Sequence, residues 1–274
     1  MLRTRVLTGA VIAVAAIVIV FFLPPAGFRM AIALLLLIGC HEYTRLGSLN
    51  RPVRALVLGA QTAIFGWLLI AWEGVQPHAA AFLVAACLSW CLMLLRLVTF
   101  RPQRPPGLNY RFLTAFAALA SLSFAAYALF WLHDRPAGGL LVLLLLLIIW
   151  SADIGAYFTG RRFGRHRLAP AISPGKTWEG LAGGLILATI VAAAYSAMTS
   201  AIPSPALLVA PVAVLTAAVS AAGDLFISIH KRTVDLKDSG RLFPGHGGVL
   251  DRFDSLLAGA PFFALGVYLL RAAT

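Results

Sequence analysis

The chain has 274 residues, of which 61% are hydrophobic and only 12% are charged, and its mean hydropathy is +0.90. This composition excludes an ordinary soluble domain and a disordered chain, because neither carries so much apolar surface. Apolar runs of about 18 or more residues recur, which is the length that crosses roughly 30 Å of hydrocarbon as a helix. The short alternating strands of a transmembrane barrel do not occur in the sequence. We therefore predict an all-α, polytopic helical membrane protein.

Hydropathy predicts about nine transmembrane helices in a single integral membrane domain, residues 1–274. No internal repeat or long linker divides the chain, so residues 1–135 supply N-terminal spans and residues 136–274 supply the catalytic spans and loops. The first apolar run is longer than that of a usual signal peptide and is expected to remain as an uncleaved span. The expected spans are 6–23, 28–45, 53–72, 79–98, 112–132, 138–158, 179–200, 204–227 and 250–270.

The basic residues predict an orientation for these spans. With the N-terminus in the cytoplasm, all Lys and Arg residues except Arg29, Arg135 and Arg271 fall in cytoplasmic segments. The positive-inside rule then predicts an N-in, C-out protein of the inner (cytoplasmic) membrane, with its polar loops facing the cytoplasm. This bias accounts for much of the net charge of +12. No aromatic–basic motif accompanies the charge, so we expect no nucleic-acid partner.

Most of the ten acidic residues lie in or beside the last two cytoplasmic loops, where topology gives them no role. Asp251 and Asp254 are one helical turn apart at the start of the last span, and Asp224 ends the preceding span. Convergent carboxylates suit Mg²⁺, which commonly keeps one or two of them together with water and substrate phosphates. We expect these three, with the intramembrane Asp153, to be metal ligands. Ion pairing with nearby Arg and Lys is the alternative, and we favour it for Asp235.

The polar stretch 228–254 also carries glycines suited to phosphate binding. Gly247 and Gly248, like Gly240 and Gly245, let the backbone approach a ligand so that exposed N–H groups bind phosphate oxygens. His246 stands among them, and two readings stay open for it: donation to a phosphate oxygen, or a structural role only.

The loop after residue 158 repeats this chemistry. Asp153 and Tyr157 lie one turn apart at the end of a span, and Arg161, Lys176 and Thr177 supply cationic and hydroxyl donors for phosphate. The SPGKT segment is similar to the end of a P-loop, but a proline stands at 170, where the first glycine of that motif belongs. A P-loop is therefore excluded.

Together the two polar segments resemble the phosphatidate cytidylyltransferase (CDP-diacylglycerol synthase) family. The matching positions are Ser228, Lys231, Arg232, Lys237, Asp238, Gly240, His246, Gly247, Gly248, Asp251, Arg252 and Asp254, preceded by Asp153, Tyr157, Gly160, Arg161, Phe163, Gly164, Ser173, Pro174, Lys176, Thr177, Glu179 and Gly180. The resemblance covers roughly the C-terminal half, and the first five spans match only in hydropathy. Ile227 and His230 depart from the family pattern, which has a glutamate and an apolar residue there.

The resemblance implies transfer of a cytidylyl group from CTP to phosphatidic acid in the lipid bilayer, giving CDP-diacylglycerol and pyrophosphate for phospholipid synthesis. It implies Mg²⁺ as cofactor and leaves a second, monovalent cation open. The implied catalytic residues are Asp224, Asp251, Lys231, Lys237 and His246; the implied substrate contacts are Tyr157, Arg161, Lys176, Thr177, Ser228, Arg232, Asp238, Gly247, Gly248 and Arg252; and the metal ligands are Asp153, Asp224, Asp251 and Asp254.

Other functions remain open from the sequence. A CTP-dependent lipid kinase would need the same phosphate contacts, and the isoleucine at 227 leaves room for a diverged, non-catalytic paralogue. The CDP-alcohol phosphotransferase motif has a different aspartate spacing from this chain. An ion-coupled transporter would place its acids near the bilayer midplane between inverted repeats, and none are visible. A homodimer is neither predicted nor excluded.

Overall fold

The structure is a computed structural model, and it describes residues 2–99, 107–199, 202, 206–245 and 247–272. Eight helices within these residues are long and apolar enough to cross a membrane, and the N-terminal helix adds a shorter apolar segment. The predicted all-α, polytopic class is therefore confirmed. The long helices are α1 (Leu2–Phe22), α2 (Pro25–Leu46), α3 (Arg51–Ile70), α5 (Ala79–Thr99), α6 (Leu108–His133), α7 (Gly138–Phe163), α8 (Trp178–Met198), α9 (Ala206–Thr233) and α10 (Leu250–Ala272).

Four short elements connect the long helices. They are α4 (Trp72–Val75), the 3₁₀ helix η1 (Gln76–His78), and the strands β1 (Arg167–Ala169) and β2 (Ser173–Thr177). The two strands form an antiparallel hairpin in which Arg167 pairs with Thr177 and Ala169 with Ser173. The sequence predicted a loop at this position. The hairpin gains a further bond, because Nη1 of Arg167 donates to the carbonyl oxygen of Pro174.

Helix boundaries follow local signals in the sequence. Pro25 begins α2, and a proline fits the first helical turn because its missing N–H has no intrahelical partner there. Oδ1 of Asn50 accepts from the N–H of Val53 and caps α3. Oγ1 of Thr177 accepts from the N–H of Gly180 and caps α8 in the same way.

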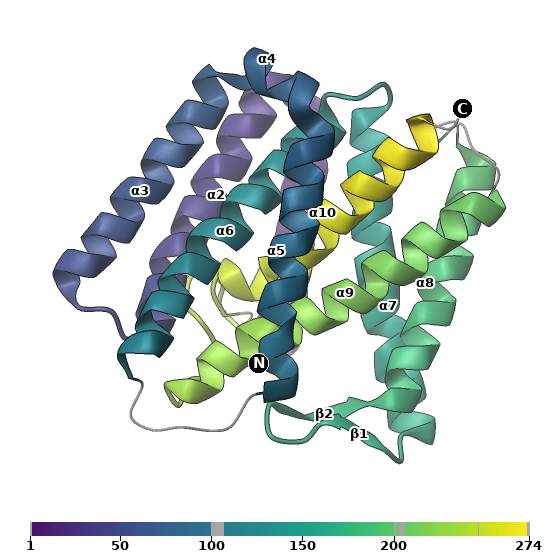
Figure 1. The fold of residues 1–274 in the computed structure, drawn as a ribbon. Coiled ribbons are helices and arrows are strands. Elements are labelled where there is room, and N and C mark those ends of the chain that lie inside the picture. Colours follow the sequence, from purple (N-terminus) through teal and green to yellow (C-terminus); the bar gives the residue numbers. More distant parts are fainter. Residues whose placement is uncertain (1, 100–106, 200–201, 203–205, 246, 273–274) are drawn as a thin grey trace.

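The helix α10 lies at the centre of the bundle. It packs against α9 and α6 and also contacts α2, α5 and α7, while α9 runs diagonally beside it toward α8 (Figure 1). Most side chains of α10 from Leu250 to Ala264 are buried. Asp251 in the first turn of α10 is therefore enclosed by protein, whereas Arg252 beside it is exposed.

Glycines let α7 and α8 approach each other closely, and this is the most extensive helix pair in the fold. A Cβ atom at Gly155 of α7 would lie 2.8 Å from the carbonyl oxygen of Gly183, and one at Gly180 of α8 would lie 2.9 Å from that of Ala156. Small residues at such a seam allow the two backbones to touch. In a membrane the hydrophobic effect does not drive helices together, so close van der Waals packing of this kind holds the pair.

Two helices extend beyond their predicted ends. The spans predicted to end at 158 and 227 continue as α7 to Phe163 and as α9 to Thr233. The extra turns carry basic residues, which are favourable at the negative end of the helix dipole. As a result Ser228 and Lys231, expected in a loop, project from a rigid helix.

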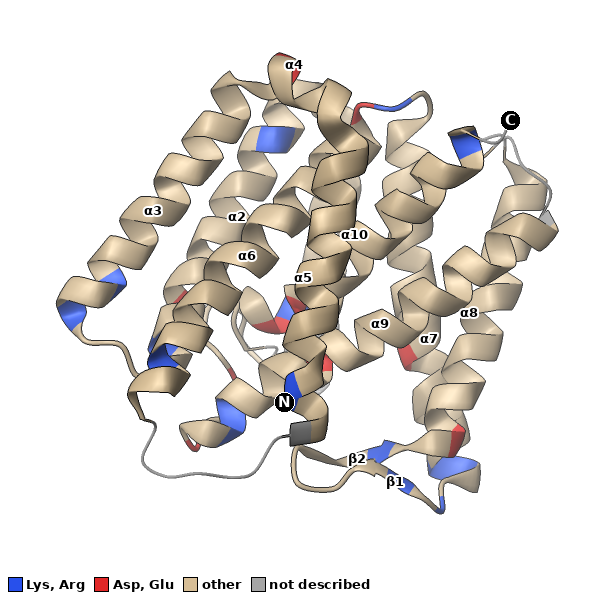
Figure 2. Ribbon diagram, viewed as in Figure 1, with Lys and Arg blue, Asp and Glu red and all other residues tan. Residues whose placement is uncertain are grey.

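The charged residues gather mainly at the end of the bundle that carries the hairpin (Figure 2). The three basic residues expected on the opposite side also lie together: Arg29 pairs with Asp134, Arg135 donates to Gln76, and Arg271 donates to the carbonyl oxygen of Pro136. The predicted separation of charge between the two ends thus agrees with the structure. Which end faces the cytoplasm stays a prediction.

We expect Gly155→Ala to lower the thermal unfolding midpoint of the purified chain in detergent. The added methyl group has no room in the seam, and overpacking of this kind costs about 1–3 kcal/mol. Gly59→Ala in α3 is the matched control, because its Cβ would meet no atom within 4 Å. Equal midpoints for the two variants would show that the seam does not depend on bare backbone at this position.

Candidate functional site

A continuous series of charged groups (Lys176, Asp224, Asp254, Lys231 and Asp251) runs from β2 through α9 to α10, and we call it the charged chain. Nζ of Lys176 lies 2.5 Å from Oδ2 of Asp224, and the carboxyl groups of Asp224 and Asp254 interact with each other. Nζ of Lys231 lies 3.6 Å from Oδ2 of Asp254 and 3.0 Å from Oδ1 of Asp251. Four of the predicted site residues on α9 and α10 are therefore brought together with the predicted lysine of β2.

The helix α9 aligns its polar residues by their spacing. Asp224, Ser228 and Lys231 are four and three residues apart and so lie along one helix face. Oγ of Ser228 donates to Oδ1 of Asp224 at 3.5 Å. The side chain of Lys231 is only 9% exposed, and a buried ammonium group persists only when it is paired. Lys231 therefore fixes two carboxylates of α10 against α9.

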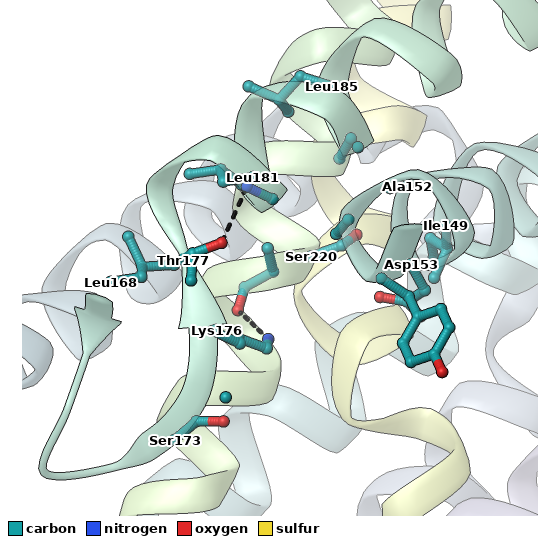
Figure 3. A pocket seen from close by; sticks show the side chains of 17 residues that line it. Ile149, Ala152, Asp153, Leu168, Ser173, Lys176, Thr177, Leu181, Leu185 and Ser220 are labelled. Carbon is teal, nitrogen blue, oxygen red and sulfur yellow. Dashed lines mark hydrogen bonds between the residues drawn. The ribbon is translucent and has the colours of Figure 1, made fainter. Parts of the chain in front are cut away.

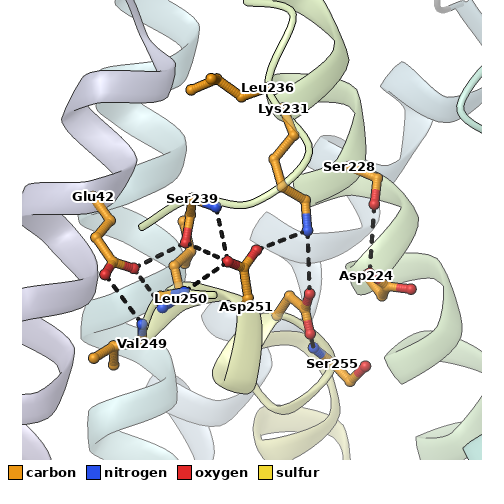
Figure 4. A network of polar contacts seen from close by, with 12 residues as sticks. Glu42, Asp224, Ser228, Lys231, Leu236, Ser239, Val249, Leu250, Asp251 and Ser255 are labelled. Atoms are coloured by element: carbon orange, nitrogen blue, oxygen red, sulfur yellow. Dashed lines mark hydrogen bonds and ion pairs between the residues drawn. The ribbon is translucent and has the colours of Figure 1, made fainter. Parts of the chain in front are cut away.

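Asp251 organises the loop that precedes α10. Its Oδ2 accepts from the N–H and the Oγ of Ser239, at 2.8 and 3.0 Å, and from the N–H of Gly248 at 2.9 Å (Figure 4). With Lys231 on the other oxygen, the carboxylate is already occupied on both sides by protein donors. Gly247, at φ +83°, makes the turn that brings this loop onto α10, and only glycine adopts that conformation without strain.

A cavity of about 440 Å³ lies beside the charged chain, between α7, α8, α9 and β2 (Figure 3). Its walls are largely apolar, with Ile149 and Leu185 among them, while Asp153, Lys176 and Thr177 line a polar part. The charged groups of Lys176, Asp224 and Arg252 act electrostatically on Asp153. The cavity thus joins an apolar wall to one end of the charged chain, as an amphiphilic ligand requires.

The structure adds a residue that the sequence analysis missed. Glu42 of α2 is 5% exposed, and its carboxylate accepts from the N–H groups of Val249 and Leu250 and from Oγ of Ser239 (Figure 4). The signal was available, because Glu42 is an acid near the end of an otherwise apolar span. The same criterion selected Asp153.

Several predicted substrate contacts lie outside the charged chain. Arg161 donates to the hydroxyl group of Tyr157 on the exposed end of α7. The Arg232 guanidinium donates to the carbonyl oxygens of Ile172 and Leu236 and so ties the hairpin turn to the loop after α9. Lys237, Asp238, Arg252 and Asp235 are exposed. The roles of Lys237, Asp238 and Arg252 toward a substrate stay predictions, as does the ion pairing favoured for Asp235, and His246 lies outside the described residues.

The two departures from the family pattern are both buried. Ile227 is fully buried and packs in the main hydrophobic core. His230 is 5% exposed, with Nδ1 bonded to the carbonyl oxygen of Phe226 and its ring against Tyr43 and Tyr110. Since a carbonyl oxygen only accepts, Nδ1 carries a proton. Both residues therefore serve packing here.

Mg²⁺ fits part of this arrangement. Among the residues with described positions, no group of three or more His, Cys, Asp or Glu side chains is arranged to hold a metal ion. The carboxyl groups of Asp224 and Asp254 nevertheless interact with each other, and the repulsion between two neighbouring ionised carboxylates is relieved by a shared proton or a cation. Mg²⁺ commonly takes one or two carboxylates and completes its shell with water and phosphate oxygens. The pair satisfies that requirement.

Fold and site together define a polytopic membrane protein with a charged, cavity-linked site at one end of its helices. The sequence model of the cytidylyltransferase family matches residues 3–270, and the chain belongs to this family. It is 34% identical to phosphatidate cytidylyltransferase of Haemophilus influenzae, over 96% of this chain and 98% of the relative. The corresponding enzyme of Pseudomonas aeruginosa is 35% identical over 96% of each chain, and that of Bacillus subtilis is 44% identical over 42% of this chain and 43% of the relative.

These comparisons confirm the family that the motifs indicated and correct its extent. The resemblance was assigned to the C-terminal half, whereas the similarity extends over nearly the whole chain. The early spans are poor in polar motifs, so motif reading underestimated them.

We expect Lys231→Met to lower the thermal unfolding midpoint of the full chain in detergent. The change leaves the carboxylates of Asp251 and Asp254 buried without their shared cation, and breaking a buried pair in this way costs about 3–5 kcal/mol. Lys237→Met is the stability control, because Lys237 is exposed on the loop. If both variants unfold at the wild-type midpoint, the charged chain does not contribute to stability.

Proposed function

We propose that this chain is a phosphatidate cytidylyltransferase, which transfers a cytidylyl group from CTP to phosphatidic acid and releases pyrophosphate. The observation that carries the proposal is the charged chain beside an amphiphilic cavity, in a member of the cytidylyltransferase family. Curated relatives named phosphatidate cytidylyltransferase align over nearly the whole chain. The product, CDP-diacylglycerol, would serve phospholipid synthesis.

The reaction joins two anions, so positioning and charge neutralisation account for most of its barrier. Phosphatidic acid brings its own phosphate nucleophile, and no protein nucleophile is required. Lys176 lines the polar part of the cavity and is proposed to hold a substrate phosphate there. The apolar walls formed by α7, α8 and α9 are proposed to receive the lipid portion of phosphatidic acid.

Asp224 and Asp254 are proposed to hold Mg²⁺, which when bound polarises the α-phosphate and neutralises the pyrophosphate. Charge balance supports this assignment. Four aspartates of the site, counting Asp153 and Asp251, share the cations of Lys176, Lys231 and Arg252. Negative charge therefore remains in excess, and it is concentrated where Asp224 meets Asp254. The proposal leaves room for a second, monovalent cation beside Mg²⁺.

The site is further proposed to face the cytoplasm from the inner membrane. CTP is a soluble, highly charged nucleotide that does not cross a bilayer. The hairpin end of the bundle, which holds the site, is also the end where most charged residues gather (Figure 2). The positive-inside rule assigns that end to the cytoplasm.

The purified full chain is expected to convert CTP and phosphatidic acid to CDP-diacylglycerol only when Mg²⁺ is added. Mass spectrometry of the lipid product and an assay for pyrophosphate measure the reaction. Release of CDP with a phosphorylated lipid would instead indicate a CTP-dependent kinase. Absence of any product across phosphatidic acids of different chain length would favour a non-catalytic paralogue.

Two aspartates are expected to behave differently in that assay. Asp224→Asn should reduce turnover at least 100-fold with little change in unfolding midpoint, because Asp224 is 28% exposed and its ion pair contributes little to stability. Asp251→Asn should lose activity and also unfold at a lower temperature, because its carboxylate accepts from Lys231, Ser239 and Gly248. Full activity of Asp224→Asn would contradict the metal assignment.

A further inference from the structure

The carboxylate of Glu42 is enclosed by the loop that precedes α10. Oε1 accepts from the N–H of Val249 at 3.1 Å, and Oε2 accepts from the N–H of Leu250 at 2.8 Å and from Oγ of Ser239 at 2.9 Å. Backbone N–H groups at the start of a helix have no intrahelical acceptor. Glu42, which comes from α2 about two hundred residues earlier, satisfies these donors at the head of α10.

The fit around Glu42 is close from both sides of the loop. A Cβ atom added at Gly240 or at Gly248 would collide with its carboxylate. The backbone at Gly240 and the backbone at Gly248 therefore lie directly against the carboxylate of Glu42. A carboxylate in this place holds the two ends of the loop at a fixed separation.

Glu42 is also linked to the charged chain through Ser239. Oγ of Ser239 lies between Oε2 of Glu42 and Oδ2 of Asp251, and its single proton serves only one of them at a time. Oδ1 of Asp251 accepts from Lys231, which approaches Asp254 as well. Moving Glu42 would therefore also move Asp254, because Ser239, Asp251 and Lys231 connect the two by direct contacts.

We propose that Glu42 is a positioning residue for cytidylyl transfer: it seats the head of α10 so that Asp254 meets Asp224. The inference rests on the proposed function, and it makes α2 a part of the site. Glu42 accepts only from protein donors among the described contacts, so it acts through Ser239 and α10 and does not touch a substrate. Partners of this kind typically change metal affinity or activity 10–100-fold when they are removed.

The donors that surround the side chain of Glu42 require a carboxylate. Its donors are N–H and O–H groups, and a carboxylate is an acceptor on both oxygens. Glutamine would turn an NH₂ group toward at least one of these donors, and aspartate is one methylene too short to reach both ends of the loop. The helix N-terminus adds a favourable field for negative charge, which glutamine does not use.

The test compares Glu42→Gln with Glu73→Gln in the full-length chain in detergent, since Glu73 is exposed on α4. The readouts are kcat, the KM for CTP, the Mg²⁺ concentration at half-maximal rate, and the affinity for Mn²⁺ measured by electron paramagnetic resonance. We expect Glu42→Gln to raise the half-maximal Mg²⁺ concentration and weaken Mn²⁺ binding 10–100-fold, with kcat partly recovered at high Mg²⁺. Glu73→Gln should match the wild type in every readout.

A pair of glycine variants tests the same contact without changing Glu42. Gly240→Ala places a methyl group against the carboxylate, whereas Gly39→Ala, three residues before Glu42 on α2, meets nothing closer than 3.8 Å. We expect Gly240→Ala to shift metal dependence in the same direction as Glu42→Gln, and Gly39→Ala to behave as the wild type. The double variant Glu42→Gln/Gly240→Ala should fall short of the sum of the single effects, because both act on one contact.

Each outcome decides the proposal. If Glu42→Gln lowers only the yield of folded protein, and the folded fraction keeps the wild-type Mg²⁺ dependence and Mn²⁺ affinity, the proposal is overturned. If the wild type shows no cytidylyl transfer, the proposed function fails, and Mn²⁺ affinity alone decides the role of Glu42. Weaker Mn²⁺ binding by Glu42→Gln then supports it, and equal binding, or none by the wild type, overturns it.

Discussion

The ion pair between Lys231 and the two aspartates of α10 is the interaction on which the site depends. An unpaired charge in the interior of an apolar bundle is costly, so the pair holds only while both helices keep their relative position. That requirement links the end of α9 to the start of α10 and orders the loop between them. From this pair the other charges extend in two directions, toward Lys176 on the hairpin and toward Ser239 and Glu42 on α2.

The two directions have different chemical characters. Toward the hairpin the groups are partly exposed, Lys176 borders the cavity, and the two carboxyl groups of Asp224 and Asp254 interact. Toward α2 the groups are buried and every carboxylate oxygen has protein donors. The first half is therefore open to ligands, and the second half is a support that gives the first its geometry. An enzyme that binds anionic substrates needs both an open site and a rigid support that fixes the positions of its charged groups.

Much of the fold and part of the site could be predicted from the sequence. Hydropathy located the spans, and the spacing of Asp251 and Asp254 placed them on one helix face near Asp224. The extension of α9 past residue 227 was missed, because charges normally end a span and only their pairing in three dimensions retains the helix. Glu42 could be noticed as an acid near the end of an apolar span, but its partners could not be predicted, because two of its three donors are backbone N–H groups whose position depends on tertiary structure. Hairpin pairing around Pro174 was hidden for the same reason.

The place of α2 in the site has a consequence for how this chain tolerates being divided. The part of the sequence rich in motifs begins near α7, and it would be natural to treat the preceding residues as a detachable anchor. Since α2 supplies Glu42 at the head of α10, a fragment that starts after α6 lacks the acceptor around which its own loop closes. The head of the last helix is therefore completed by an N-terminal helix, and the two halves of the sequence form one structural unit.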